Sequence, residues 1–211
     1  RRAMIAAVAG RAGPVLLEIP REVLASTAVG EIRLGNGGQP ITTPWSRPAP
    51  VADDVEEVAQ VLRSASRPLF VFGGGVLWSG AQASARALVD ASGVPALTTG
   101  TARGVVPEDH PLYAGCPGRL GDKTADAALA EADCVVAVGV RLTDLTTSDW
   151  NLPRPETILF QVNIDPEALG REMPVTMRIE ADAGLFLDSL CVQLSKPPLA
   201  NGKWGFAWHE K

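Results

Sequence analysis

The sequence predicts an α/β fold: a doubly wound, six-stranded parallel sheet with helices on both faces. Strand-sized runs that are apolar throughout alternate with helical segments from Val51 onward, and uniformly apolar strands are typical of parallel sheets covered on both faces. The run at residues 68–72 stops on three consecutive glycines, Gly73 to Gly75, before a helical segment. A strand that enters a helix through a glycine turn is the first unit expected of such a fold.

Length, charge and cysteine content limit the class of protein. The 211 residues, 46% of them hydrophobic, suffice for one well-packed domain plus extra pieces. A net charge of −5 gives no basic surface, so we expect neither nucleic acid nor an anionic membrane as partner. The apolar runs are strand-sized and no signal-peptide pattern opens the chain, which favours a cytoplasmic protein. Cys116, Cys134 and Cys191 are widely spaced and are expected to be reduced thiols.

The first fifty residues divide into two segments. Residues 1–29 contain a helical run, Arg2–Ala9, and an apolar run, Val15–Ile19, that predicts a strand. One helix and one strand cannot bury their own faces. We therefore expect this segment to belong to a sheet elsewhere, with residues 1–20 either disordered or paired with a second copy. Residues 30–50 are rich in glycine and proline, which is linker composition.

The elements from residue 51 follow from periodicity. Acids at 53 and 54 precede an apolar stripe of period 3.6, which predicts a helix that ends near Leu62. Further helices are expected over 76–91, 124–132 and 184–194, where apolar residues again gather on one face or follow a glycine. Strands are expected over 69–72, 94–100, 134–139, 157–164 and 177–180, which names five of the six.

A ligand of this fold binds outside the carboxyl ends of the strands, where the strand order reverses. There the sequence places glycines, threonine hydroxyls, the guanidinium of Arg141, and an amide and carboxylates, which suit phosphates and ribose hydroxyls. The dinucleotide fingerprint Gly-x-Gly-x-x-Gly is incomplete, because its sixth position is Trp78. Plainer readings stay open: a tight turn for the glycines, a surface ion pair for Arg141, and a turn or helix cap for Asp165-Pro166.

Five segments, in order, resemble one enzyme family. Arg11-Ala12-Gly13-Pro14-Val15-Leu16-Leu17-Glu18-Ile19-Pro20 resembles the segment that ends the first domain of acetolactate-synthase-like thiamine diphosphate enzymes. The others are similar to that family's Gly-Gly-Gly turn (72–81), its Thr-Thr...Glu-Asp-His-Pro segment (98–111), its Gly-Ala-Arg-Phe-Asp-Asp motif (139–144) and its Ile-Asp-Ile-Asp-Pro motif (162–166).

The resemblance implies a three-domain enzyme and a domain division for this chain. Residues 1–29 would end the pyrimidine-binding domain, 30–50 would be a linker, 51–194 the central, Rossmann-like domain of the DHS-like NAD/FAD-binding type, and 195–211 a tail toward the diphosphate-binding domain. The first and third domains of such enzymes hold thiamine diphosphate and Mg²⁺ between subunits of a dimer or tetramer. The resemblance therefore assigns no catalytic residue and no metal ligand here, and the chain alone is expected to be inactive.

In some relatives the central domain holds FAD without a redox role, in others ADP, and in others nothing. Carrying their contacts over gives the predicted cofactor-binding residues: Arg11, Gly73, Gly74, Gly75, Thr99, Gly100, Gly139, Val140, Arg141, Asn163, Asp182 and Ala183. Leu145 stands where the family pattern has a second arginine, and Asn163 where an acid often sits. A 2-keto-acid carboligase of acetolactate synthase type is implied, with a related decarboxylase or a stand-alone FAD- or ADP-binding domain as alternatives.

Overall fold

The computed structural model describes residues 2–27, 30, 46–195 and 204, which fall into two units, residues 1–47 and 48–211. The first unit contains helices α1 (Arg2–Val8) and α2 (Arg21–Ala25). The strand predicted over Val15–Ile19 is wrong: these residues have no regular secondary structure, and Leu16 and Leu17 are exposed. A strand needs a neighbour to satisfy its backbone groups, and no described residue pairs with this segment. Most of the predicted linker lies outside the described residues.

The second unit is built on five parallel strands in the order β2-β1-β3-β4-β5. Their bounds are β1 Pro68–Phe72, β2 Ala96–Thr98, β3 Cys134–Val138, β4 Ile158–Asn163 and β5 Met177–Glu180. The predicted doubly wound sheet is confirmed, with one strand fewer than expected. At the outer edge of β2, residues 112–115 exchange hydrogen bonds with Ala96 and Thr98 but form only an isolated bridge. Pro111 and Pro117 flank this segment, and proline cannot donate to a ladder.

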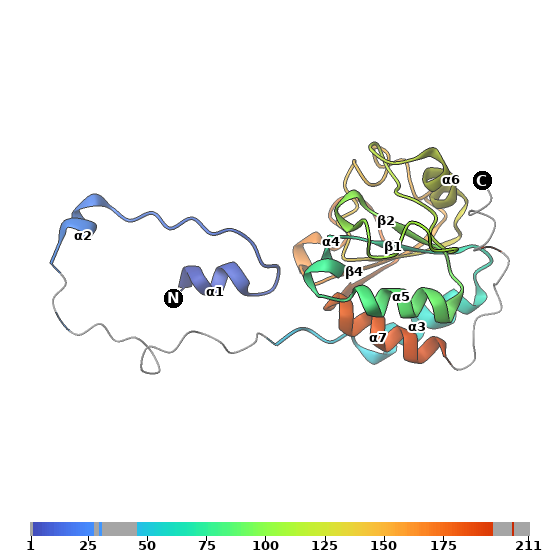
Figure 1. The fold of residues 1–211 in the computed structure, drawn as a ribbon. Helices are drawn as coiled ribbons and strands as arrows, with labels where there is room; N and C mark the ends of the chain where they lie inside the picture. Colours follow the sequence, from blue (N-terminus) through green and yellow to red (C-terminus); the bar gives the residue numbers. More distant parts are fainter. Residues whose placement is uncertain (1, 28–29, 31–45, 196–203, 205–211) are drawn as a thin grey trace. The chain divides into compact units, whose positions relative to one another are not determined.

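Helices cover both faces of the sheet unequally. α3 (Ala52–Ser64), α5 (Gln82–Ser92) and α7 (Ala183–Leu194) pack on one face, and α6 (Lys123–Glu131) lies on the other (Figure 1). The single helix predicted over 76–91 is two helices, α4 (Gly74–Trp78) and α5. The chain turns between them at Gly80, whose φ of 71° is left-handed and ends the helix.

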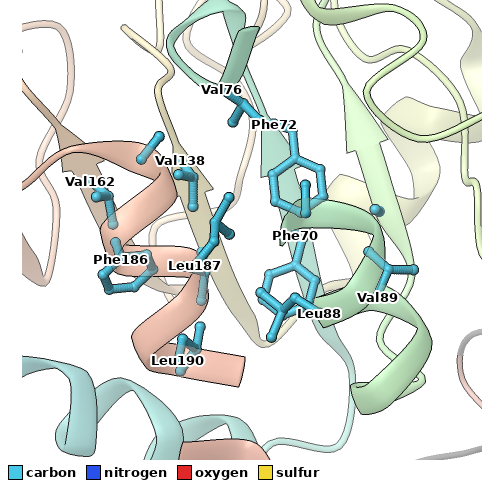
Figure 2. Close-up of a cluster of buried hydrophobic side chains, with 14 of the residues drawn as sticks. Phe70, Phe72, Val76, Leu88, Val89, Val138, Val162, Phe186, Leu187 and Leu190 are labelled. Carbon is cyan, nitrogen blue, oxygen red and sulfur yellow. The ribbon is translucent and has the colours of Figure 1, made fainter. Parts of the chain in front are cut away.

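Two hydrophobic clusters explain why the strands are apolar throughout. On the three-helix face, Phe70 and Phe72 of β1 stack with ring centroids 5.7 Å apart and pack with side chains of α5 and α7 (Figure 2). On the α6 face, a smaller cluster includes Leu69 and Val71. Each buried Leu or Phe contributes about 1.5–3 kcal/mol. Consecutive residues of β1 therefore stabilise opposite faces of the sheet.

The end of the described chain returns to this smaller cluster. Trp204 packs against it and its indole Nε1 donates a hydrogen bond of 2.9 Å to the carbonyl of Pro68, at the start of β1. Apart from Ser195 and Trp204, the predicted tail lies outside the described residues. Over the part of the chain that is described, no helix is long and apolar enough to cross a membrane.

Candidate functional site

The strand order reverses between β1 and β3. The chain leaves β1 toward β2 on one side and later returns to place β3 on the other side of β1. The carboxyl ends of these two strands carry the predicted residues Gly73–Gly75 and Gly139–Arg141. This is the edge at which a doubly wound sheet accepts ligands, and the strand order brings these two segments beside each other.

The glycines of the two turns touch through their backbones. A Cβ on Gly73 would lie 2.3 Å from the carbonyl oxygen of Gly139, and one on Gly75 would lie 2.6 Å from the Cα of Gly139. The N–H of Gly73 donates to the Val138 carbonyl at 2.9 Å and the N–H of Gly75 to the Gly139 carbonyl at 3.1 Å. Both donors therefore face β3 and its turn. These contacts support the interpretation that the glycines serve a tight turn. A role of the glycines in ligand binding stays a prediction.

Two buried amides of β4 hold the turn after β3. Gln161 Nε2 donates to the Val140 carbonyl at 3.0 Å, and Asn163 Nδ2 donates to the same oxygen at 3.3 Å. The carbonyl ends of these amides are also engaged: Gln161 Oε1 accepts from the N–H of Gly170, and Asn163 Oδ1 from the N–H of Asp165. We call this pair the amide clamp. It fixes the backbone immediately before Arg141.

Gln161 is absent from the sequence-predicted set. The available signal was a polar residue inside an otherwise apolar strand, two positions before Asn163 and so on the same face. Its side chain is 1% exposed, and a buried amide requires partners.

The end of β2 adds hydroxyl groups beside the glycine turn. Thr99 is buried and its Oγ1 lies 3.2 Å from Thr101 Oγ1, within a short 3₁₀ turn that begins at the exposed Gly100. Thr101 Oγ1 is also 3.3 Å from the position that a Cβ on Gly74 would take. The predicted residues of β1 and β2 are therefore close together at this edge.

Asp182 serves the fold at the start of α7. Its Oδ1 accepts hydrogen bonds from the N–H groups of Gly184 at 3.0 Å and Leu185 at 3.2 Å, which makes it the helix N-cap. The hydroxyl of Ser79, after α4, donates to the same oxygen at 2.8 Å. Ala183 is buried as the first residue of α7. Ser79, which the sequence did not single out, thereby links α4 to α7.

The two arginines of the predicted site lie in different units of the chain. Arg141 is exposed at the switch point, directly after the clamped Val140. Arg11 is exposed in the first unit, and its place beside the other predicted residues stays a prediction.

Burial keeps the thiols and the phenol near the sheet neutral. Burial raises the pKa of the Cys134 thiol to about 12. Burial also raises the pKa of Cys116 and of Tyr113, whose hydroxyl lies 3.3 Å from Thr98 Oγ1. None of these three is therefore suited to act as a nucleophile or base at neutral pH. Across the described residues, no group of three or more His, Cys, Asp or Glu side chains could hold a metal ion.

A cavity of about 470 Å³ opens near the amino end of β4, away from the predicted site. Its walls include Trp150, Met173 and three prolines. Three of its lining polar groups already have partners: Thr157 the Ala132 carbonyl, Asn151 the Ser148 carbonyl and Glu172 the side chain of Arg171. Arg154, which also lines the cavity, is exposed. The strand-end edge receives polar groups from the turns after several strands, so it is the stronger candidate site.

The sheet order and the converging turns define a doubly wound domain of the kind that holds ligands at its switch point. The chain matches the family model "Thiamine pyrophosphate enzyme, central domain" over residues 55–190, and it belongs to that family. The predicted family is thus confirmed.

Three similar proteins bear on the wider context. The acetolactate synthase large subunit of Corynebacterium glutamicum is 34% identical over 181 residues, which cover 84% of this chain and 28% of that subunit. The isozyme 2 large subunit of Escherichia coli is 30% identical over 184 residues, 87% of this chain and 32% of that subunit. Benzoylformate decarboxylase from Polynucleobacter necessarius has a TM-score of 0.71 at 23% identity, covering 91% of this chain and 35% of that one, a likeness of fold. The chain spans about a third or less of the length of these proteins.

Proposed function

We propose that this chain acts as the central domain of a thiamine diphosphate-dependent 2-keto-acid carboligase of the acetolactate synthase type. The observation that carries the proposal is the identity of 34% to an acetolactate synthase large subunit over 84% of the chain. The likeness to a decarboxylase is 23% in sequence and concerns the fold, so carboligation is preferred to simple decarboxylation.

The domain's main role in this proposal is structural. Thiamine diphosphate and Mg²⁺ would be held by other domains of a dimeric or tetrameric enzyme, and this chain by itself would not catalyse the reaction. The engagement of the edge residues in the fold supports this role: Asp182 caps α7, Asn163 belongs to the amide clamp, and the glycines pack turn against turn.

The strand-end edge is also proposed to hold an adenine nucleotide, as FAD or ADP. The N–H groups of Gly73 and Gly75 face β3 and already donate to its end and turn, so they are not the groups that would hold a phosphate. Exposed side chains at this edge fit that role instead. The exposed guanidinium of Arg141 would pair with the diphosphate, as arginine does through two parallel hydrogen bonds. The amide clamp would keep the backbone that precedes this guanidinium in place.

A segment exchange tests the carboligase proposal. Residues 1–211 replace the aligned segment of the Corynebacterium glutamicum large subunit, and the chimera is given a panel of 2-keto acids. We expect products in which two keto-acid-derived units are joined, as with the unaltered host enzyme. Release of free aldehyde without joined products, from a chimera that assembles like the host, would contradict the proposal.

Calorimetry of the 211-residue chain tests the other two parts. Titration with thiamine diphosphate and Mg²⁺ should give no binding heat, and a stoichiometric complex would show that the chain holds the cofactor unaided. Titration with ADP should give binding that Arg141→Gln weakens by at least about tenfold, the equivalent of one charge-assisted hydrogen bond. Arg154→Gln, at an exposed arginine of the cavity near the amino end of β4, is the matched control.

A further inference from the structure

The amide clamp leaves the proposed nucleotide site without the acid that its relatives often place on β4. The resemblance puts an Asp or Glu at the position of Asn163, where a carboxylate could accept hydrogen bonds from ribose hydroxyls. In this chain Asn163 is 8% exposed, its Nδ2 donates to Val140 and its Oδ1 accepts from Asp165. A carboxylate could not make the donation to Val140. The fold therefore uses one donor and one acceptor position of Asn163, and this amide is a weaker acceptor for ribose hydroxyls than a carboxylate would be.

The register of β4 and β5 places another acid beside Asn163. Asn163 is paired with Glu180, and Gln161 with Arg178. Register partners in adjacent strands point to the same face, and neighbouring strands lie about 4.8 Å apart. Ile179, between the two β5 residues, belongs to the cluster on the opposite, three-helix face. Glu180 thus shares the α6-side face with Asn163, one strand further from the switch point.

Glu180 differs from Asp165 and Asp182, two other acids of this edge, because its carboxylate makes no contact that holds the fold together. It is exposed, and its carboxylate forms no hydrogen bond or ion pair with any residue that the structure describes. Asp182 caps α7 and Asp165 accepts from the N–H of Glu167 at 3.1 Å. Glu180 accordingly keeps its oxygens open to a ligand, and its register position beside Asn163 distinguishes it from Glu167, which is likewise exposed after β4.

Arg141 and Glu180 provide opposite charges at a spacing that suits a nucleotide. Arg141 follows β3 and Glu180 ends β5, with β4 between them. Two strand spacings separate these ends by about 10 Å. A ligand with an anionic diphosphate at one end and a neutral diol at the other matches this order of charges.

We propose that Glu180 recognises the ribose hydroxyls of the adenine nucleotide. From the adjacent strand β5, it takes the place of the acid that relatives often have at the position of Asn163 on β4. This inference rests on the proposed nucleotide binding. A carboxylate accepts from both hydroxyls of a ribose, and it repels a ribose that carries a 2′-phosphate, as acids do in dinucleotide-binding domains. The site therefore selects nucleotides with free ribose hydroxyls.

The test compares ADP, 2′,3′-dideoxy-ADP and adenosine 2′,5′-bisphosphate by calorimetry on the 211-residue chain. Glu180→Gln should weaken ADP binding about tenfold, which corresponds to ~1.4 kcal/mol, and should leave the dideoxy analogue within about twofold. Glu180→Gln should also tighten the binding of adenosine 2′,5′-bisphosphate, because the charge that repels its 2′-phosphate is removed. A loss of structure in the variant would instead weaken the binding of all three ligands. Glu180 is exposed, and unfolding curves will establish that the variant is folded.

Glu167→Gln removes the same charge from another exposed position on this edge and serves as the control. It should change none of the three affinities beyond about twofold. If the unaltered chain does not bind ADP, the nucleotide proposal and this inference both fail. If the chain binds ADP and Glu180→Gln binds it equally well, or if Glu167→Gln weakens it as much, only the role of Glu180 is overturned.

Discussion

Replacing Gly73 by alanine tests whether the glycine turn exists for contact between backbones. Gly73 has φ −112°, which any residue can adopt, so alanine pays no conformational cost there. Its Cβ, however, would lie 2.3 Å from the Gly139 carbonyl oxygen and 2.8 Å from the carbonyl carbon. Backbone atoms cannot rotate away as a side chain can. We expect destabilisation of about 3 kcal/mol, the upper part of the usual range for overpacking.

Substitutions at two further glycines separate steric clash from backbone strain as causes of destabilisation. Gly93 ends α5 with φ 69° and open space around a Cβ, so Gly93→Ala should cost only the left-handed strain of about 1–2 kcal/mol. Gly100 has neither strain nor neighbours, and Gly100→Ala should change stability by less than about 0.5 kcal/mol. Urea unfolding followed by circular dichroism gives the free energies, with constant m values as the check. If Gly73→Ala were as stable as Gly100→Ala, the two turns would not be in contact and the reasoning would be refuted.

Three other substitutions test buried groups. The pKa of Cys134 rises from 9.0 in the unfolded chain to about 12 in the folded one, so its contribution to stability is complete below pH 9 and falls above it. From pH 9 to 10.5 the unfolding free energy should therefore drop more steeply in the unaltered chain than in Cys134→Ala, by up to about 1.4 kcal/mol per pH unit; parallel curves would contradict this. Asn163→Asp should cost about 1–3 kcal/mol at pH 7, since the donor to Val140 is lost and a charge is buried. The cost should shrink at pH 4, where a protonated carboxyl can donate, and an equal loss at both pH values would argue against the clamp. Asp182→Ala removes the α7 cap and should cost about 1–2 kcal/mol by thermal unfolding; Asp188→Ala, exposed on the same helix, should cost little.

The sheet could be predicted from the sequence because each strand has a recognisable apolar pattern of its own. A strand buried on both faces must be apolar at every position, as β1 and β3 are. The failures have non-local causes. Val15–Ile19 has the composition of a strand but no neighbour among the described residues. The break between α4 and α5 depends on Gly80, and a single glycine within a helical pattern does not reveal whether the chain will turn there.

The edge of the sheet on which the candidate residues lie was predictable, but the contacts that these residues make were less so. Parallel strands deliver their carboxyl ends to one edge, so Gly73, Gly139 and Asn163 could be placed together from the order of elements alone. Which atoms they contact depends on the register between strands that lie far apart in the chain. The double donation of Gln161 and Asn163 to Val140 is of this kind, because no local pattern states which carbonyl a buried amide will meet.

The glycine triplet therefore says little about whether this edge holds a nucleotide. The contact between Gly73 and Gly139 would be required even of a domain with no ligand, since it lets the turns after β1 and β3 pack together. For the proposed nucleotide, the informative side chains are ones that the fold does not use, such as Arg141 and Glu180. Under the nucleotide proposal, a relative that shares the glycines and lacks these two charges should keep the fold but bind no adenine nucleotide. Such a relative would separate the structural role of the glycines from a role in ligand binding.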